Sequence, residues 1–174
     1  MAWYDTVAVI SLIIAFFAGA AISLKFSVVA PRIKTLLLDA DGTLLDFDRS
    51  EESALRDAFA ALGLPYDENT HRVYHKINDA CWKALERGEI TREQLKVNRF
   101  RETFAALGVE GDPVLATKSY EASLGNYAYP FPGAEEACRR LSHKYSLYLV
   151  TNGLKNVQSA RIVTTSIPEC LKGI

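Results

Sequence analysis

A short apolar stretch that runs directly into two carboxylates constrains this chain more than any other feature. The four residues from Thr35 to Leu38 are apolar or β-branched, which predicts a short strand buried on both faces. Asp39 and Asp41 follow, and because side chains alternate along an extended backbone, both point the same way at the carboxyl end of the strand. Open α/β sheets bind ligands at that end, so the pair predicts a ligand site there.

Two carboxylates at this spacing suit phosphoryl transfer through a covalent aspartyl phosphate. One attacks phosphorus as the nucleophile, and the other protonates the leaving alcohol and then accepts a proton from the hydrolytic water. Because adjacent carboxylates repel each other without a cation, we expect Mg²⁺, a hard ion that prefers oxygen ligands. The alternative is a solvated acidic turn. A calcium loop does not fit, because Leu44, Leu45 and Phe47 interrupt its ligand pattern.

The stretch from Leu36 to Leu44, an apolar strand followed by Asp-x-Asp-Gly-Thr-Leu, resembles the first motif of the haloacid dehalogenase (HAD) superfamily of phosphatases. The resemblance implies that Asp39 is the nucleophile and Asp41 the general acid/base. It also implies that both hold Mg²⁺, Asp41 through its backbone carbonyl. Dehalogenases of the superfamily lack the second aspartate, so its presence favours a phosphomonoesterase.

Residues 1–30 form an apolar N-terminal segment with an uncharged run at residues 7–24. The run is near the minimum length of a membrane-spanning helix. Asp5 precedes it and Lys25 follows it, so the positive-inside rule predicts an inner-membrane anchor with the N-terminus outside and the catalytic part in the cytoplasm. A cleaved signal peptide and upstream sequence read from a wrong start codon are the alternatives.

Residues 49–126 are predicted to form a helical insertion in a core made of residues 31–48 and 127–162. Four amphipathic helices are expected. A capping box of Asp48 with Glu51 starts the first, Gly88 ends the second, a capping box of Thr91 with Gln94 starts the third, and Asp112 before Pro113 starts the fourth. In the superfamily that the chain resembles, an insertion here is a mobile cap that excludes water and selects the leaving group.

Part of this cap, Asn78 to Thr91 with Arg99 and Phe100, resembles the bacterial pyrimidine 5′-nucleotidase branch of the superfamily. The implied substrate is a small phosphorylated molecule, a nucleoside 5′-monophosphate. Trp82 could stack on a base and Arg99 could contact a polar edge or a phosphate. We favour the alternatives, in which Trp82 packs inside the cap and Arg99 is a solvated helix residue.

The remaining chemistry-bearing residues show no metal-binding spacing. His71 and His75 lie four residues apart without a third ligand, which predicts a surface pair. The cysteines, Cys81, Cys138 and Cys170, are scattered and fit reduced thiols in a cytosol. A net charge of −1 gives no reason to expect a nucleic-acid partner.

A second predicted strand, Tyr145 to Val150, ends in Thr151 and Asn152. This order resembles the second motif of the superfamily, in which the threonine hydroxyl and the following backbone amide hold phosphate oxygens. A hydroxyl and an N–H at a strand end suit an oxyanion. We therefore expect Thr151 and Asn152 to bind phosphate.

Residues 163–174 depart from the superfamily. A lysine of the third motif and an acidic pair of the fourth are absent, and Lys172 lies in a tail where only a short strand over residues 163–168 is expected. The predicted fold is therefore α/β: a Rossmann-type core with a truncated parallel sheet, a helical cap and an N-terminal apolar helix. Two hypotheses remain, an impaired Mg²⁺-dependent phosphomonoesterase, and a non-catalytic, membrane-tethered pseudo-phosphatase or gene fragment.

Overall fold

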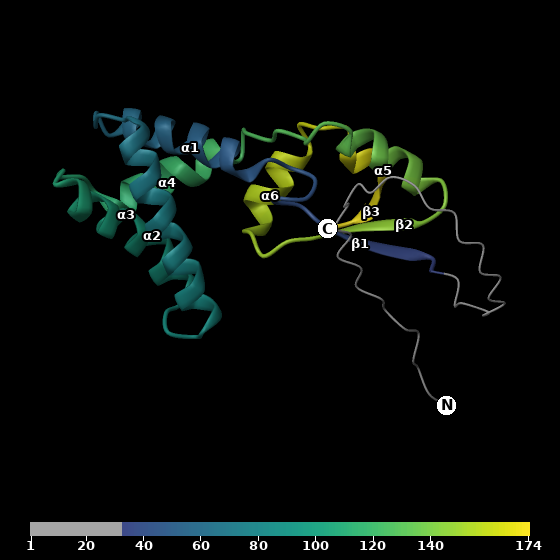
Figure 1. Cartoon of the computed structure of the whole chain (residues 1–174), viewed down its shortest axis with the longest axis horizontal. Helices are drawn as coiled ribbons and strands as arrows, with labels where there is room; N and C mark the ends of the chain where they lie inside the picture. Colours follow the sequence, from purple (N-terminus) through teal and green to yellow (C-terminus); the bar gives the residue numbers. More distant parts are fainter. Residues whose placement is uncertain (1–32) are drawn as a thin grey trace, which may run out of the picture.

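A computed structural model describes residues 33–174, which form a parallel sheet with flanking helices and a separate group of four helices (Figure 1). The sheet has three strands in the order β1 (Thr35–Asp39), β2 (Ser146–Val150) and β3 (Leu171–Gly173), all parallel. Asp39 pairs with Val150, so β1 and β2 end at the same level of the sheet. The expected α/β fold is confirmed.

One face of the sheet is covered and the other is not. Helix α5 (Ala134–Ser142) packs on β2, where Leu147 and Leu149 are buried. On the opposite face Leu37 is 43% exposed, Tyr148 39% and Val150 49%. The expectation that β1 is buried on both faces is therefore wrong for residues 33–174, because both crossovers in the strand order β1-β2-β3 run over one face.

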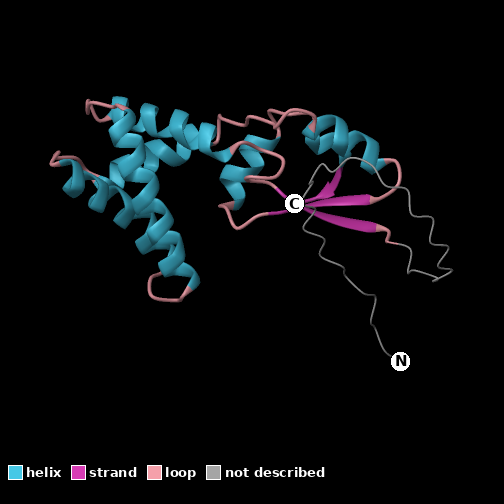
Figure 2. Ribbon diagram, viewed as in Figure 1, coloured by secondary structure: helices cyan, strands magenta, loops and turns pink. Residues whose placement is uncertain are grey.

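Four helices form the second part, on the far side of α6 (Lys155–Ile162) from the sheet (Figure 2). They are α1 (Phe47–Ala61), α2 (Glu68–Glu86), α3 (Arg92–Leu107) and α4 (Pro113–Leu124). Their core is a set of aromatic rings with neighbouring centroids 5.2–6.2 Å apart, contributed by Phe59, Tyr74, Phe100, Phe104 and Tyr120. Large rings in edge and tilted contact provide the apolar burial that stabilises this group, which we call the cap.

The helix starts agree with the sequence in two places and differ in one. Thr91 and Gln94 form the expected capping box of α3, and Asp112 caps α4. Helix α1 instead begins after Asp46, whose side chain accepts from the Arg49 backbone N–H at 3.1 Å. The predicted box of Asp48 with Glu51 is wrong, because the Glu51 side chain turns into the cap interior, where it is 0% exposed.

The chain passes between core and cap twice, and the two crossings lie side by side. The outgoing crossing runs through Asp46 and the return crossing through Tyr127 to Pro130. The Asp46 backbone N–H donates to the Tyr129 carbonyl at 2.8 Å, and Leu45 forms an isolated antiparallel bridge with Pro130. The two chain crossings between core and cap are therefore joined to each other by hydrogen bonds.

The last twelve residues differ from the expectation. Residues 163–166 form turns, a 3₁₀ helix follows (Ile167–Cys170), and the strand of this segment is β3. The predicted short strand over residues 163–168 is wrong, because the Thr164 and Thr165 hydroxyls donate back to the carbonyls at the end of α6 at 2.7 and 2.8 Å. Ile167 is fully buried, so this segment packs into the core.

The predicted membrane span at residues 7–24 lies outside the described residues. Within residues 33–174, none of the helices combines the length and the apolar character that a membrane crossing needs.

Candidate active site

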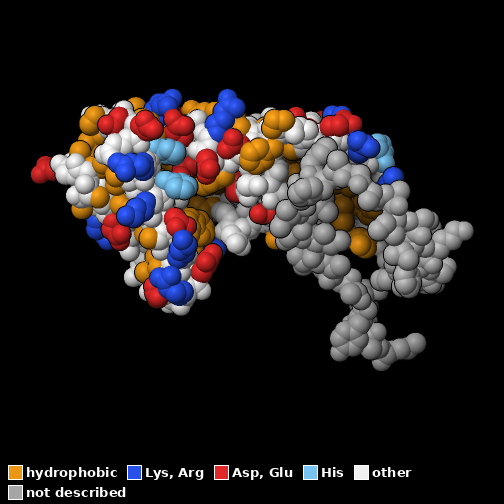
Figure 3. All heavy atoms as spheres, in the orientation of Figure 1, with side chains coloured by type: hydrophobic (Ala, Val, Ile, Leu, Met, Phe, Trp, Pro, Cys, Tyr) orange, Lys and Arg blue, Asp and Glu red, His pale blue; other side chains and the backbone are white. Residues whose placement is uncertain are grey.

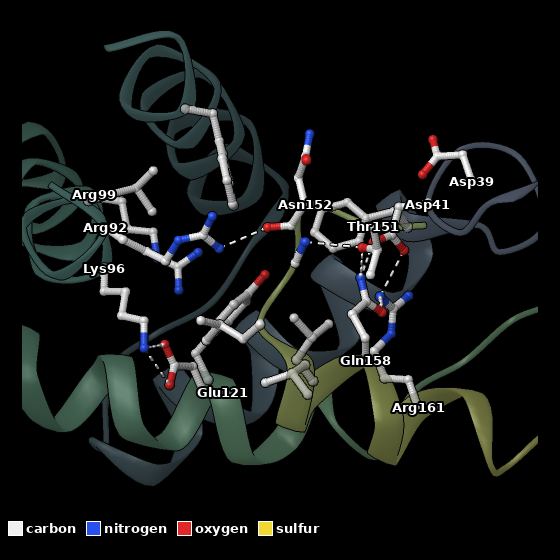
Figure 4. A pocket seen from close by; sticks show the side chains of 18 of the residues that line it. Asp39, Asp41, Arg92, Lys96, Arg99, Glu121, Thr151, Asn152, Gln158 and Arg161 are labelled. Atoms are coloured by element: carbon white, nitrogen blue, oxygen red, sulfur yellow. Dashed lines mark hydrogen bonds and ion pairs between the residues drawn. The ribbon is translucent and has the colours of Figure 1, made fainter. Parts of the chain in front are cut away.

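A cavity of about 310 Å³ lies between the carboxyl ends of β1 and β2 and the cap (Figure 4). All six residues that the sequence nominated line it: Asp39, Asp41, Trp82, Arg99, Thr151 and Asn152. The aligned strand ends bring together the four core residues, and α2 and α3 carry the two cap residues, Trp82 and Arg99. The structure therefore places the sequence candidates at one site.

Asp39 lies at the exposed end of β1. Its Oδ1 accepts from the Ala40 backbone N–H at 2.9 Å. Partial burial raises the pKa of the Asp39 carboxyl, the Ala40 N–H lowers it, and the negative charge of Asp41 raises it again. Gly42, at φ 75°, then turns the chain so that its N–H reaches the Leu45 carbonyl at 2.9 Å.

Asp41 is held from the other side by α6. Its Oδ1 accepts from Arg161 Nη1 at 2.7 Å, and its Oδ2 accepts from Gln158 Nε2 at 2.5 Å. The same Gln158 nitrogen donates to Thr151 Oγ1 at 2.9 Å, and the Gly153 backbone N–H also donates to Thr151 Oγ1, at 3.0 Å. Since this hydroxyl already accepts two hydrogen bonds, its own proton is free to point to a bound oxyanion.

Sequence reasoning missed Gln158 and Arg161. The available signal was their spacing of three residues, which places both on one face of the helix that follows Thr151. Their partner Asp41 is 117 and 120 residues away in the sequence, so no local pattern could reveal the contact.

The cap side of the cavity carries positive charge. Arg92 reaches across to the core, where its Nη1 donates to the Asn152 carbonyl at 2.8 Å. Its guanidinium carbon also lies 6.0 Å from the ring centroid of Trp82, which is half-buried and lines the cavity. Lys96 Nζ pairs with Glu121 at 3.0 Å. Arg92, Lys96 and Glu121 are further cavity residues that the sequence did not single out.

Arg99 is not a solvated helix residue, because it is only 6% exposed. Its guanidinium carbon lies 4.6 Å from the ring centroid of Tyr120, and its Nη1 donates weakly to Asn78 Oδ1 at 3.4 Å. Among the described residues, neither Arg99 Nε nor the Tyr120 hydroxyl has a hydrogen-bond partner. Both residues line the cavity, and each has a buried polar atom whose hydrogen-bonding capacity is unused.

The two histidines of α2 are also more than a surface pair, although Figure 3 shows histidine side chains adjoining one another on the cap surface. His75 Nδ1 lies 2.8 Å from Glu51 Oε2, and His71 Nε2 lies 4.0 Å from the same oxygen. Asn78 Nδ2 donates to Glu51 Oε1 at 2.8 Å. Burial raises the pKa of the Glu51 carboxyl, and the hydrogen bond with Glu51 raises the pKa of His75.

The donor chemistry at the strand ends fits Mg²⁺ with few protein ligands. Within residues 33–174, no group of three or more His, Cys, Asp and Glu side chains is arranged to hold a metal ion. The Asp39 carboxylate and the Asp41 backbone carbonyl are both oxygen donors. Mg²⁺ in phosphoryl-transfer sites commonly uses one or two carboxylates and completes its shell with water and substrate phosphate. Asp39 and Asp41 could therefore hold it together with the substrate.

A known protein family matches most of this chain. The model of the haloacid dehalogenase-like hydrolases matches residues 33–166. The chain belongs to this family. The sequence resemblance to the HAD superfamily is thereby confirmed.

The chain is also similar to two named proteins. The HAD-like hydrolase described here is 34% identical over 131 residues to YfnB of Bacillus subtilis, which is named as a HAD-hydrolase, and the match covers 75% of this chain and 56% of YfnB. It is 32% identical over 135 residues to the pyrimidine 5′-nucleotidase PynA of Streptococcus pneumoniae, covering 77% of this chain and 57% of PynA. The chain therefore spans just over half the length of these curated relatives.

Solved structures agree with the fold. A crystal structure of YfnB bound to magnesium matches with a TM-score of 0.79 at 32% identity and covers 83% of this chain and 63% of that one. The L-2-haloacid dehalogenase of Xanthobacter autotrophicus matches with a TM-score of 0.59 at 19% identity and covers 81% of this chain and 55% of that one. At that identity, the second likeness supports the fold alone.

Proposed function

We propose that this HAD-like hydrolase is a Mg²⁺-dependent phosphomonoesterase that acts on a nucleoside 5′-monophosphate through an aspartyl phosphate. The observation that carries the proposal is the convergence of Asp39, Asp41 and the Thr151 hydroxyl at the aligned ends of β1 and β2. A nucleophile, a second carboxylate and an oxyanion donor in one cavity are the groups that phosphoester hydrolysis requires.

In this proposal Asp39 attacks phosphorus and the ester oxygen leaves with a proton from Asp41. Asp41 then removes a proton from the water that cleaves the Asp39 acyl phosphate, which returns both carboxyls to their starting forms. The Thr151 hydroxyl and the Asn152 backbone N–H hold the phosphate oxygens. Bound Mg²⁺ would neutralise charge between Asp39 and the phosphate dianion.

The cap supplies the recognition of the leaving group. Trp82 offers a ring face for a base, and Arg99 offers a donor to its polar edge. The similarity to the pyrimidine 5′-nucleotidase PynA supports a pyrimidine nucleotide. The magnesium and the interdomain movement named for the YfnB structure support a Mg²⁺ site and a cap that closes over the cavity. We accordingly propose residues 49–126 as the cap, residues 31–48 and 127–162 as the core, and residues 163–174 as a segment outside the family pattern.

A non-catalytic phosphate-binding protein is the second candidate. It is favoured by the finding that, within residues 33–174, no third acidic side chain joins Asp39 and Asp41 to form a metal cluster. Anchoring by residues 7–24, with the catalytic part in the cytoplasm, stays a prediction that concerns residues outside the described part.

The test is phosphate release by the full chain from UMP, dUMP and an aryl phosphate, with and without Mg²⁺. We expect Mg²⁺-dependent release that is fastest with the pyrimidine nucleotides and is abolished by Asp39→Asn. Asp79→Asn is the matched control, because Asp79 is exposed on α2 and, within residues 33–174, pairs only with Lys83. Folded protein without release, or release that survives Asp39→Asn, would favour the second candidate or another nucleophile.

A further inference from the structure

Arg161 is a fully buried cation at the junction of the core and the cap. It is 0% exposed, although a guanidinium carries its charge at any physiological pH. A buried charge is costly unless it is paired and hydrogen-bonded. Every nitrogen of Arg161 has a partner: Nε donates to the Tyr127 carbonyl at 2.9 Å, Nη2 to Ser50 Oγ at 3.2 Å, and Nη1 to Asp41 Oδ1 at 2.7 Å and Gln158 Oε1 at 3.0 Å.

These partners belong to different segments of the chain. Ser50 lies in the first turn of α1, directly after the outgoing crossing to the cap. Tyr127 lies in the return crossing, which the Asp46–Tyr129 backbone bond joins to the outgoing one. Asp41 lies in the loop after β1, at the cavity. Arg161 is thus the side chain that contacts both crossings and the second carboxylate of the site.

The guanidinium is planar and its donors are fixed relative to one another. A rotation of the cap that displaces Ser50 and Tyr127 must therefore tilt the guanidinium or break its bonds. Either change alters the hydrogen bond that Arg161 donates to Asp41 Oδ1. The other oxygen, Oδ2, is held by Gln158, which also holds the Thr151 hydroxyl, so the tilt is transmitted to the oxyanion donor as well.

We infer that Arg161 is a positioning residue that couples the orientation of the Asp41 carboxylate to the position of the cap. The inference rests on the proposed function, because it treats Asp41 as the group that exchanges a proton with the leaving oxygen. Arg161 lines the cavity, but its donors are directed to Asp41, Gln158, Ser50 and Tyr127, so we infer that it acts through Asp41. It ensures that Asp41 is presented to the cavity only when the junction is in one arrangement.

The first test compares Arg161→Met, which removes all four donated bonds at similar length, with Arg161→Lys, which keeps the charge. Arg140→Met is the matched control, because Arg140 is an exposed residue of α5. Per folded molecule, Arg161→Met should lower kcat about 10- to 100-fold with little change in KM, as expected when part of the acid–base contribution is lost. Arg161→Lys should recover part of kcat. An unchanged kcat per folded molecule would overturn the inference.

The second test does not depend on turnover. Hydrogen exchange of the full chain, measured by mass spectrometry, should show faster exchange in Arg161→Met at two separate places, the loop over residues 40–46 and the return crossing over residues 127–131. The turn between α2 and α3 should not change. If exchange rises only in α6, or rises evenly everywhere, the coupling is refuted. If the wild type shows no turnover but Arg161→Met still exchanges faster at both places, the proposed function is rejected and the coupling between Arg161 and the two segments stands.

Discussion

Replacing His75 by alanine should weaken the cap in a pH-dependent way. The side chain of Glu51, a residue of α1, is 0% exposed. Its carboxylate forms hydrogen bonds with His75 Nδ1 and Asn78 Nδ2 of α2, each at 2.8 Å. His75→Ala removes the hydrogen-bond partner of Glu51 Oε2 and leaves only His71 Nε2, at 4.0 Å, near that oxygen. A buried acceptor that loses its partner carries the cost of its desolvation into the folded state.

The size of the effect follows from two opposing terms. A hydrogen bond to a charged group contributes about 1.5–3 kcal/mol, and because the His75 side chain is 53% exposed, water replaces part of it and about 1–2 kcal/mol remains. Alanine is the better helix former by roughly 0.5 kcal/mol. The free energy of unfolding should therefore fall by about 0.5–1.5 kcal/mol.

The pH dependence has a definite sign. The pKa of His75 is raised by its bond to Glu51 from an ordinary value of 6.5, so its contribution is complete below pH 6.5 and is lost as the pH rises through the folded-state pKa. The pKa of Glu51 is raised by burial from 4.5, so the folded state is penalised as the pH rises above that value. Both groups make stability fall with rising pH, and His75→Ala should flatten the fall above pH 6.5.

The assay is urea unfolding followed by circular dichroism at pH values on both sides of 6.5. His143→Ala is the control, because His143 is an exposed residue at the end of α5. The reasoning is refuted if His75→Ala unfolds at the wild-type midpoint, or if wild-type stability rises through this pH range.

Three further perturbations test the site and the sheet. Gly42→Ala should lower the free energy of unfolding by about 1–2 kcal/mol because of its φ of 75° alone, since nothing lies within 4 Å of the added Cβ. Gly125→Ala, at φ −59°, should lower it by less in the same urea assay, and equal losses would contradict this explanation. Thr151→Val should raise KM for UMP about 10-fold or more by removing a donor to a charged ligand, and an unchanged KM would remove Thr151 from the site. Because Leu37, Tyr148 and Val150 expose an apolar sheet face, we expect the protein to associate as its concentration rises in analytical ultracentrifugation. Tyr148→Lys should reduce this association by charging the face, and undiminished association would place the contact elsewhere.

The sequence predicted the parts of the fold that local patterns determine. Three features depend on neighbouring residues and lie where expected: the carboxylates at the end of β1, Thr151 at the end of β2, and the Thr91 capping box. Leu37 shows the limit, because an apolar run does not tell which face of a strand a later element covers. Arg161 shows another, because a charged helix residue gives no local sign of a partner far away in the sequence.

Glu51 illustrates how one local rule can displace another. A glutamate three residues after Asp48 suits a capping box, but a helix that begins after Asp46 turns the same side chain inward to His75 and Asn78. The strand at the end of the chain was predicted too early, over residues 163–168 instead of at β3. Thr164 and Thr165 favour a strand by residue type, but their hydroxyls bond to carbonyls of α6 and form turns there.

The most direct test of the account asks whether Asp39 carries the phosphoryl group. The full chain is mixed with radiolabelled UMP and Mg²⁺, quenched in acid within a single turnover and digested with trypsin, which cuts after Lys34 and Arg49 and isolates residues 35–49. The account predicts transient label on this peptide, released by hydroxylamine as from an acyl phosphate and absent in Asp39→Asn. Phosphate release without label on this peptide, or label that persists in Asp39→Asn, would contradict it.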